Sequence, residues 1–123
     1  MTAVATVEPI AELSKSAKIT HLTVRLLSQY TGRGPNRSRT VLNDDIVTVV
    51  LEGTLTKGEL TLVRNGHGEV VHTTRKTFQD VMAAELISGV ERILGRTVVA
   101  FLSDINVDPD IAIKTFILAP ADR

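Results

Sequence analysis

The sequence contains no cysteine and no tryptophan, and only 3% of its 123 residues are aromatic. Without cysteine the chain forms no disulfide and offers no thiolate for a zinc ribbon, a redox motif or nucleophilic catalysis. So few aromatic side chains leave no stacking platform for bases, which argues against nucleic acid as a partner. The lack of cysteine also fits the cytosol, so we expect a cytoplasmic protein.

The sequence also lacks an excess of either charge and any long hydrophobic run. Fourteen basic residues balance fourteen acidic ones, so charge-based recognition has to be local. The longest apolar run, residues 98–102, has the length of a strand and falls far short of the roughly 18 residues that span a membrane. We therefore expect no direct membrane insertion and only peripheral contact with a membrane, through a protein partner.

The composition is that of a folded domain. Apolar residues make up 43% of the chain, which is enough for one hydrophobic core at this length. Residues 1–8 lack the basic start and long apolar run of a signal peptide. We expect residues 1–8 to be a flexible tail and residues 9–123 to form a single domain.

The first half of the chain predicts a helix followed by a β-hairpin. Pro9 suits the first turn of a helix, and apolar residues then recur every three or four positions as far as Thr31. Gly32 is a natural left-handed cap, and Gly34 and Pro35 cannot continue the helix. Two segments rich in β-branched residues follow around a polar turn, and they predict strands at 38–42 and 46–52.

The second half predicts two helices and another hairpin. A capping box at residues 56–59 begins a short helix that ends near residues 65–66. A longer helix runs from about Glu69 to Gly95, with an apolar stripe of period 3.6 formed by Phe78, Val81, Met82, Leu86, Val90 and Ile93. The final strands are expected at residues 97–106 and 111–118.

These elements predict an α+β fold in the order α-β-β-α-α-β-β. The two hairpins are best satisfied by a two-layer structure, in which a mainly antiparallel four-stranded sheet packs with the three helices. The pattern does not fix the strand order. Residues 98–102 do not alternate with polar residues, so we expect that strand to be buried on both faces, by helices or by another subunit.

Three apolar residues of the first helix lie off its main stripe. Ile19, Leu22 and Leu26 make this helix apolar on more than one side. A second contact surface would explain the pattern, so we predict a homodimer with these three residues at its interface.

No catalytic motif is found in the sequence. It has no Gly-x-Ser-x-Gly elbow, no P-loop and no dinucleotide fingerprint, so we expect no catalytic residues, no cofactor and no enzymatic activity. His67, Glu69 and His72 lie within six residues, but they supply too few ligands for a closed metal site. An enzyme remains open only if His21 meets His72 and Glu69 in the fold, and the roles of the histidines stay undecided.

The remaining candidate site is the basic segment 32–39. Its arginines, Arg33, Arg37 and Arg39, could hold a phosphorylated metabolite or bicarbonate, because guanidinium groups match oxyanions. The alternative is structural: Gly32, Gly34 and Pro35 end the helix and start the hairpin, while the arginines keep an edge strand hydrated. We assign the turn to the fold and any ligand role to the arginines, above all Arg37 and Arg39.

Several short motifs resemble those of the MpsC-like family, a bacterial family of unknown function. They are residues 32–35, 45–53, 55–56 and 103–105. The family takes its name from a component encoded with a sodium-translocating, membrane-potential-generating system whose other parts are associated with inorganic-carbon uptake. The resemblance implies an accessory or regulatory protein that docks on a membrane complex. Only the motifs at 32–35 and 103–105 transfer as shared features.

Overall fold

The computed structural model describes residues 13–121. Its first helix, α1 (Lys15–Thr31), begins where the Ser14 hydroxyl accepts a hydrogen bond from the Ala17 N–H. The helix ends at Gly32, which has a φ of 92° and donates its N–H to the Ser28 carbonyl at 2.9 Å. The predicted stop at Gly32 is confirmed. The predicted start at Pro9 is wrong, because the extended Ser14 caps the helix and Lys15 is its first residue. The predicted tail at 1–8 lies outside the described residues.

The first hairpin consists of β1 (Arg37–Asn43) and β2 (Ile46–Glu52). Asp44 takes a φ of 53° in the two-residue turn between them. Such a left-handed conformation is tolerated by Asp, which explains why a polar turn works here without glycine.

The short helix α2 (Lys57–Arg64) has both halves of the predicted capping box. The Glu59 N–H donates to Thr56 Oγ1, and the Thr56 N–H donates to Glu59 Oε1. The long helix α3 (Gly68–Leu94) then ends at Gly95, which has a φ of 65°. Local sequence signals therefore determine where α2 starts and where α3 ends.

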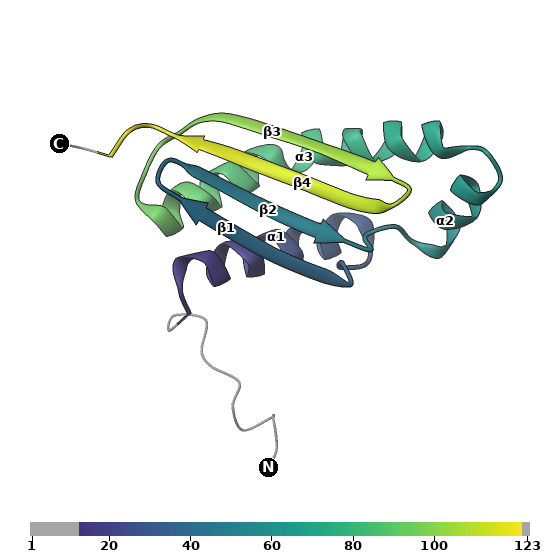
Figure 1. Ribbon diagram of the computed structural model, residues 1–123, viewed down its shortest axis with the longest axis horizontal. Helices are drawn as coiled ribbons and strands as arrows, with labels where there is room; N and C mark the ends of the chain where they lie inside the picture. The colour runs from purple at the N-terminus through teal and green to yellow at the C-terminus, as the bar shows by residue number, and fades with distance from the viewer. Residues whose placement is uncertain (1–12, 122–123) are drawn as a thin grey trace, which may run out of the picture.

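The second hairpin, β3 (Val98–Val107) and β4 (Asp110–Leu118), completes one four-stranded antiparallel sheet. The strand order is β1-β2-β4-β3, so β2 and β4 are central and β1 and β3 form the edges (Figure 1). The predicted α+β fold and its element order are confirmed.

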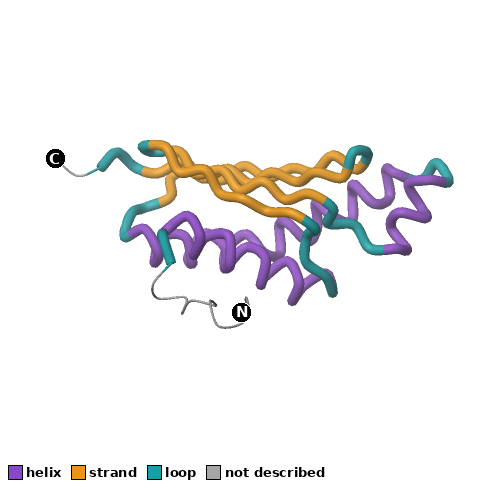
Figure 2. The backbone as a smooth tube through the Cα atoms, turned by 60° about the horizontal axis from the view of Figure 1, so that its bottom comes forward, coloured by secondary structure: helices purple, strands orange, loops and turns teal. Residues whose placement is uncertain are grey.

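The helices lie on one side of the sheet, and the other side is left uncovered (Figure 2). We call these sides the inner face and the outer face. The core lies between α1, α3 and the inner face. Its largest fully buried apolar side chains are Ile19, Leu26, Val47, Val49, Leu51, Leu55, Val71, Met82, Leu86, Val90 and Phe116. No helix in the described part is long and apolar enough to cross a bilayer.

The residues expected at a dimer interface lie instead in this core. Ile19, Leu22 and Leu26 are all buried within one chain. The reason is that α1 packs against both α3 and the strands β1 and β2, so it needs apolar side chains on more than one side. The broad apolar surface of this helix therefore provides no exposed interface.

Within one chain, β3 and part of α3 are also more exposed than predicted. Val99 and Leu102 are 61% and 60% exposed, because β3 is an edge strand whose outer face no helix covers. A register irregularity between Val98 and Ala100 adds to the exposure at Val99. Val81, which was expected on the buried stripe of α3, is also exposed.

Candidate functional site

The segment 32–39 is a tightly packed turn. A Cβ atom on Gly34 would lie 3.0 Å from Ser28 Oγ and 3.4 Å from Val24 Cγ1, so the backbone passes directly against α1. The Asn36 N–H donates to the carbonyl of Glu52 at 2.8 Å, which joins the turn to the end of β2. The turn thus connects the first helix to the sheet.

Arg33 is directed into its own chain. Its guanidinium donates to the Leu55 carbonyl at 2.6 Å, to the Gly34 carbonyl at 3.1 Å and to Asn36 Oδ1 at 2.7 Å. Each of its three nitrogens therefore already binds an acceptor within the protein. A planar fork with fixed donors is well suited to joining the turn to the segment that follows β2, so Arg33 serves the turn.

Arg37 and Arg39 have different surroundings. Both lie on the edge strand β1 with exposed side chains, and neither forms an ion pair or side-chain hydrogen bond within residues 13–121. Their places in the strand register put them on the outer face. The structure therefore separates Arg33 from the two arginines beyond it, whose ligand role stays a prediction.

The outer face is mostly apolar in its middle. The strand register and burial pattern place on it Val41 of β1, Ile46 and Val50 of β2, Ile111, Ile113 and Ile117 of β4, and Leu102 of β3. Polar and charged residues border it on the edge strands, with Arg37 and Arg39 at one edge and Asp104 and Asn106 at the other. Thr48 and Thr115, whose hydroxyl oxygens are 3.2 Å apart, lie among these apolar residues, and Glu52 lies at the end of β2. An exposed apolar patch with a polar border is typical of a protein contact.

A buried polar region lies on the inner face, beneath the first half of α3. Arg75 is almost fully buried and donates to both carboxylate oxygens of Glu59, at 2.6 and 2.8 Å, and to the Thr54 carbonyl at 2.8 Å. Partial burial raises the pKa of Glu59, but hydrogen bonds from Arg75 and Thr56 outweigh it and lower the pKa overall. This ion pair fixes α2 against α3.

Lys114 of β4 is also buried, with 2% of its surface exposed. Its ammonium donates to Ser103 Oγ at 3.2 Å, while Lys76 of α3 donates to the Ser103 carbonyl at 2.6 Å. Burial, aided by the nearby charges of Lys76 and Arg75, lowers the pKa of Lys114 to about 8. The 103–105 motif thus places Ser103 between two lysines.

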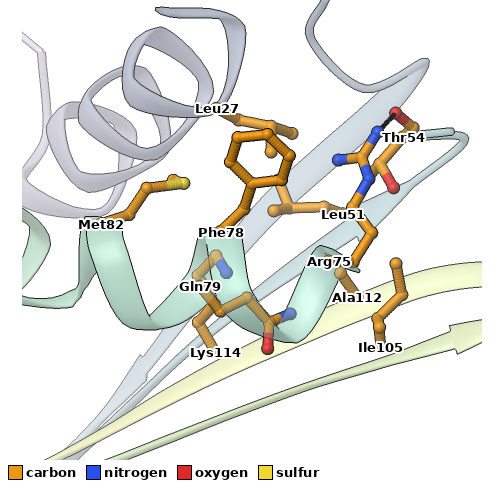
Figure 3. A pocket seen from close by; sticks show the side chains of 10 residues that line it. All are labelled: Leu27, Leu51, Thr54, Arg75, Phe78, Gln79, Met82, Ile105, Ala112 and Lys114. Atoms are coloured by element: carbon orange, nitrogen blue, oxygen red, sulfur yellow. Dashed lines mark hydrogen bonds between the residues drawn. The ribbon is translucent and has the colours of Figure 1, made fainter. Parts of the chain in front are cut away.

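A cavity of about 10 Å³ lies beside Lys114, which is room for one water molecule (Figure 3). The side chains around it include Arg75, Gln79 and Lys114, and Gln79 Oε1 is buried without a hydrogen-bond partner. A single water could accept from the ammonium and donate to this amide oxygen. The cavity is too small for a metabolite.

A serine hydroxyl beside a lysine of lowered pKa is also the beginning of a nucleophile–base pair. Acyl transfer further requires donors arranged around a developing oxyanion. At Ser103 the nearest additional cation, Lys76, is bound to the main-chain carbonyl. In the structure the Ser103 hydroxyl accepts a hydrogen bond from the Lys114 ammonium.

The histidines do not come together. His72 lies 3.3 Å from Asp104 at the edge of β3, while His67 precedes the first turn of α3 and His21 lies on the exposed side of α1. The backbone N–H of Ile105, with smaller effects from Lys76 and His72, lowers the pKa of Asp104. Within the described ranges no three histidine, aspartate or glutamate side chains form a metal-binding group.

The sequence analysis missed the buried Arg75 and Lys114. A signal for Lys114 was present, because it shares its strand face with Ala112, Phe116 and Leu118, all of them buried. A charged residue in the apolar half of an alternating strand predicts a buried charge. Arg75 had no comparable local signal, since its partner Glu59 belongs to another helix.

Comparison with known proteins confirms the family that the sequence resembles. The model of the family described as "Na+-translocating membrane potential-generating system (MpsC)" matches residues 12–120. The chain belongs to the MpsC family. It is 30% identical over 95 residues to the uncharacterized protein YrhF of Bacillus subtilis (strain 168), covering 76% of this chain and 78% of that protein. No solved structure matches this MpsC chain.

Proposed function

We propose that the chain is a non-enzymatic accessory protein of a Na+-translocating, membrane-potential-generating system, and that it acts through protein contact. The family name supports the biological setting. A component of that system would bring the protein to the membrane surface. In this proposal Arg75 serves stability, and neither Lys114 nor Ser103 takes part in catalytic turnover.

The observation that carries the proposal is the uncovered outer face of the sheet. Ile113 lies on a central strand and is 43% exposed, and Val41 and Leu102 on the two edge strands are more exposed still. Leaving such side chains in water costs on the order of 1 kcal/mol each relative to burial. Contact with another protein would bury these side chains and recover that free energy.

The test replaces an outer-face residue in the native cell and measures the Na+-dependent membrane potential with a voltage-sensitive dye. Ile113→Asp should leave the fold intact and reduce the potential as far as deletion of the whole chain. The matched control is Val81→Asp, which introduces the same charge at an exposed apolar position on α3. Full potential with Ile113→Asp would refute the proposal.

The non-enzymatic part has a separate test. Ser103→Ala removes the hydroxyl beside Lys114 and leaves the outer face unchanged. We expect a normal membrane potential with this variant. Loss of the potential with a folded Ser103→Ala protein would replace an accessory role with a catalytic one.

A second candidate function is a small-anion sensor that uses Arg37 and Arg39. Its support is that both guanidiniums are exposed on β1 and unpaired within residues 13–121. Calorimetry with phosphate and with bicarbonate should then show binding that Arg37→Ala and Arg39→Ala weaken and Arg64→Ala does not. Absence of heat with both anions at millimolar concentration would remove this candidate.

A further inference from the structure

We propose that a second copy of this chain covers the outer face, related by a two-fold axis that runs nearly parallel to the strands and places Arg39 of each copy opposite Asp104 of the other. The proposal rests on the proposed function, since it names what covers the contact surface. It commits to a dimer of two face-to-face sheets with the helices on the outside.

The strand register defines the rows of this surface. One row across the sheet, in the order β1-β2-β4-β3, consists of Arg39, Val50, Ile113 and Asp104. The next row towards the first hairpin turn consists of Val41, Thr48, Thr115 and Leu102. The rows on either side consist of Arg37, Glu52, Ile111 and Asn106, and of Asn43, Ile46, Ile117 and Ala100.

A two-fold axis along the strands exchanges β1 with β3 and β2 with β4. Arg39 then faces the partner subunit's Asp104, and the same contact recurs on the other side of the dimer. Apolar side chains meet within the same rows: Val50 with Ile113, Val41 with Leu102, and Ile46 with Ile117. Thr48 faces Thr115, Arg37 faces Asn106, and Glu52 faces Ile111, which is the one contact of a charged residue with an apolar one. Sheets packed about 10 Å apart allow long side chains at the edges to meet.

A two-fold axis across the strands gives a much poorer match. It would place Arg39 against Val41, Asp104 against Leu102, and Glu52 against Ile46. Each of these contacts removes a charge from water without a partner, which costs several kcal/mol. The order of residues in the rows therefore selects the axis parallel to the strands.

Edge-to-edge pairing of two β1 strands is the other symmetric arrangement. It would extend the sheet but leave the apolar middle of the outer face in water, and it would bring Arg37 and Arg39 close to their own copies. Like charges on adjacent strands are destabilising. Face-to-face packing both buries the apolar rows and pairs the charges.

Asp104 remains accessible to such a partner. Its side chain is 74% exposed although it contacts His72 at 3.3 Å and lies 3.9 Å from Lys76. These neighbours lie on α3 and contact Oδ1, which also accepts from the Ile105 N–H, whereas Oδ2 has no hydrogen bond within residues 13–121. A guanidinium of the opposite sheet can therefore bind the Asp104 carboxylate.

The test is a charge exchange followed by sedimentation equilibrium. The wild-type chain should be dimeric at micromolar concentration. Arg39→Glu and Asp104→Arg should each weaken the dimer roughly tenfold or more, because each change places like charges together at two symmetric contacts. The double variant should recover the affinity to within about threefold of the wild type. Arg64→Glu, on α2 far from the outer face, is the matched control.

Three outcomes would overturn the proposal. A wild-type monomer at 100 µM, on the order of a hundred times the concentration that a specific dimer needs, excludes the second copy. A dimer that ignores Arg39→Glu and Ile113→Asp uses another surface. A double variant that stays as weak as the single ones excludes this axis. If the chain is monomeric but Ile113→Asp still abolishes the membrane potential, the proposed function stands and only this inference fails.

Discussion

Gly89 of α3 lies directly against Leu22 of α1. A Cβ atom on Gly89 would come 3.1 Å from Leu22 Cδ1 and closer still to Leu22 Cδ2, so an alanine here would have to displace the end of the Leu22 side chain. Glycine in the middle of a helix costs about 1 kcal/mol relative to alanine. The close packing of α1 on α3 offsets that cost.

Gly89→Ala should therefore destabilise the protein, although alanine favours the helix. Overpacking lowers the free energy of unfolding by about 1–3 kcal/mol, and the higher helix propensity of alanine offsets up to about 1 kcal/mol of this loss. We expect a net loss of about 1–2 kcal/mol in the free energy of unfolding, measured by urea denaturation. When Leu22 is also replaced by alanine, the methyl group that Gly89→Ala adds should be tolerated. The double variant should therefore lose less free energy of unfolding than the sum of the losses in the two single variants. Additive losses would contradict the contact.

Gly53 and Gly58 form a matched pair for a second prediction. Gly53 has a φ of 70°, and a Cβ atom there would lie 2.7 Å from Asn36 Cγ. Gly58 lies in α2 without a positive φ, and its Cβ would meet only Thr56 Oγ1, at 4.0 Å. Gly53→Ala should cost at least about 1–3 kcal/mol through strain and steric overlap. Gly58→Ala should stabilise by up to about 1 kcal/mol. Equal effects of both changes in thermal unfolding would refute this assignment.

The elements that the sequence could predict are those set by neighbouring residues. Gly32 and Gly95 end their helices, the Thr56–Glu59 capping box starts α2, and a polar turn near Asp44 joins β1 to β2. In each case the interacting groups lie within a few positions of one another. Local sequence therefore determines them, and the whole order of elements follows.

The features that could not be predicted depend on long-range packing. The hydrophobic pattern shows which side chains are apolar, but it does not show which helices or strands cover them. Leu26 and Leu102 both belong to apolar segments that were predicted to be covered, yet one lies in the core and the other on the uncovered face. The difference arises because α1 and α3 share one side of the sheet, which only the strand order and the helix connections decide. For the same reason the segment 32–39 proved to contain a structural Arg33 and two exposed arginines.

The Arg75–Glu59 pair leads to a third prediction. Glu59→Gln leaves the buried guanidinium without a counter-charge and should cost roughly 3–5 kcal/mol, as expected for one-sided loss of a buried pair. The variant with both Arg75→Met and Glu59→Gln should lose less than Glu59→Gln alone. Because the pKa of Glu59 is lowered in the folded state, the wild type should lose this stability as the pH falls through the acid range, and both variants should lose less of it. A pH dependence of unfolding unchanged by Glu59→Gln would contradict this.

Lys114 leads to a prediction at the opposite end of the pH scale. Its pKa falls from 10.5 to about 8 on folding, so between these values the folded protein has released a proton that the unfolded chain retains. Stability then rises with pH across this window, because the unfolded state binds more protons there. The buried charge thus lowers stability at neutral pH by up to roughly 3 kcal/mol.

Lys114→Met keeps most of the length of the side chain and removes the charge. We expect this variant to be more stable than the wild type at pH 7 by about 1–3 kcal/mol, less whatever is lost when the Ser103 hydroxyl loses its partner. The advantage should shrink as the pH rises from about 8 to 10.5. Urea unfolding at several pH values measures the difference, and Lys57→Met on the exposed start of α2 is the control, with no such trend. A constant difference between the variant and the wild type would show that Lys114 stays charged in the folded protein, and that the cavity beside it hydrates the ammonium better than its burial implies.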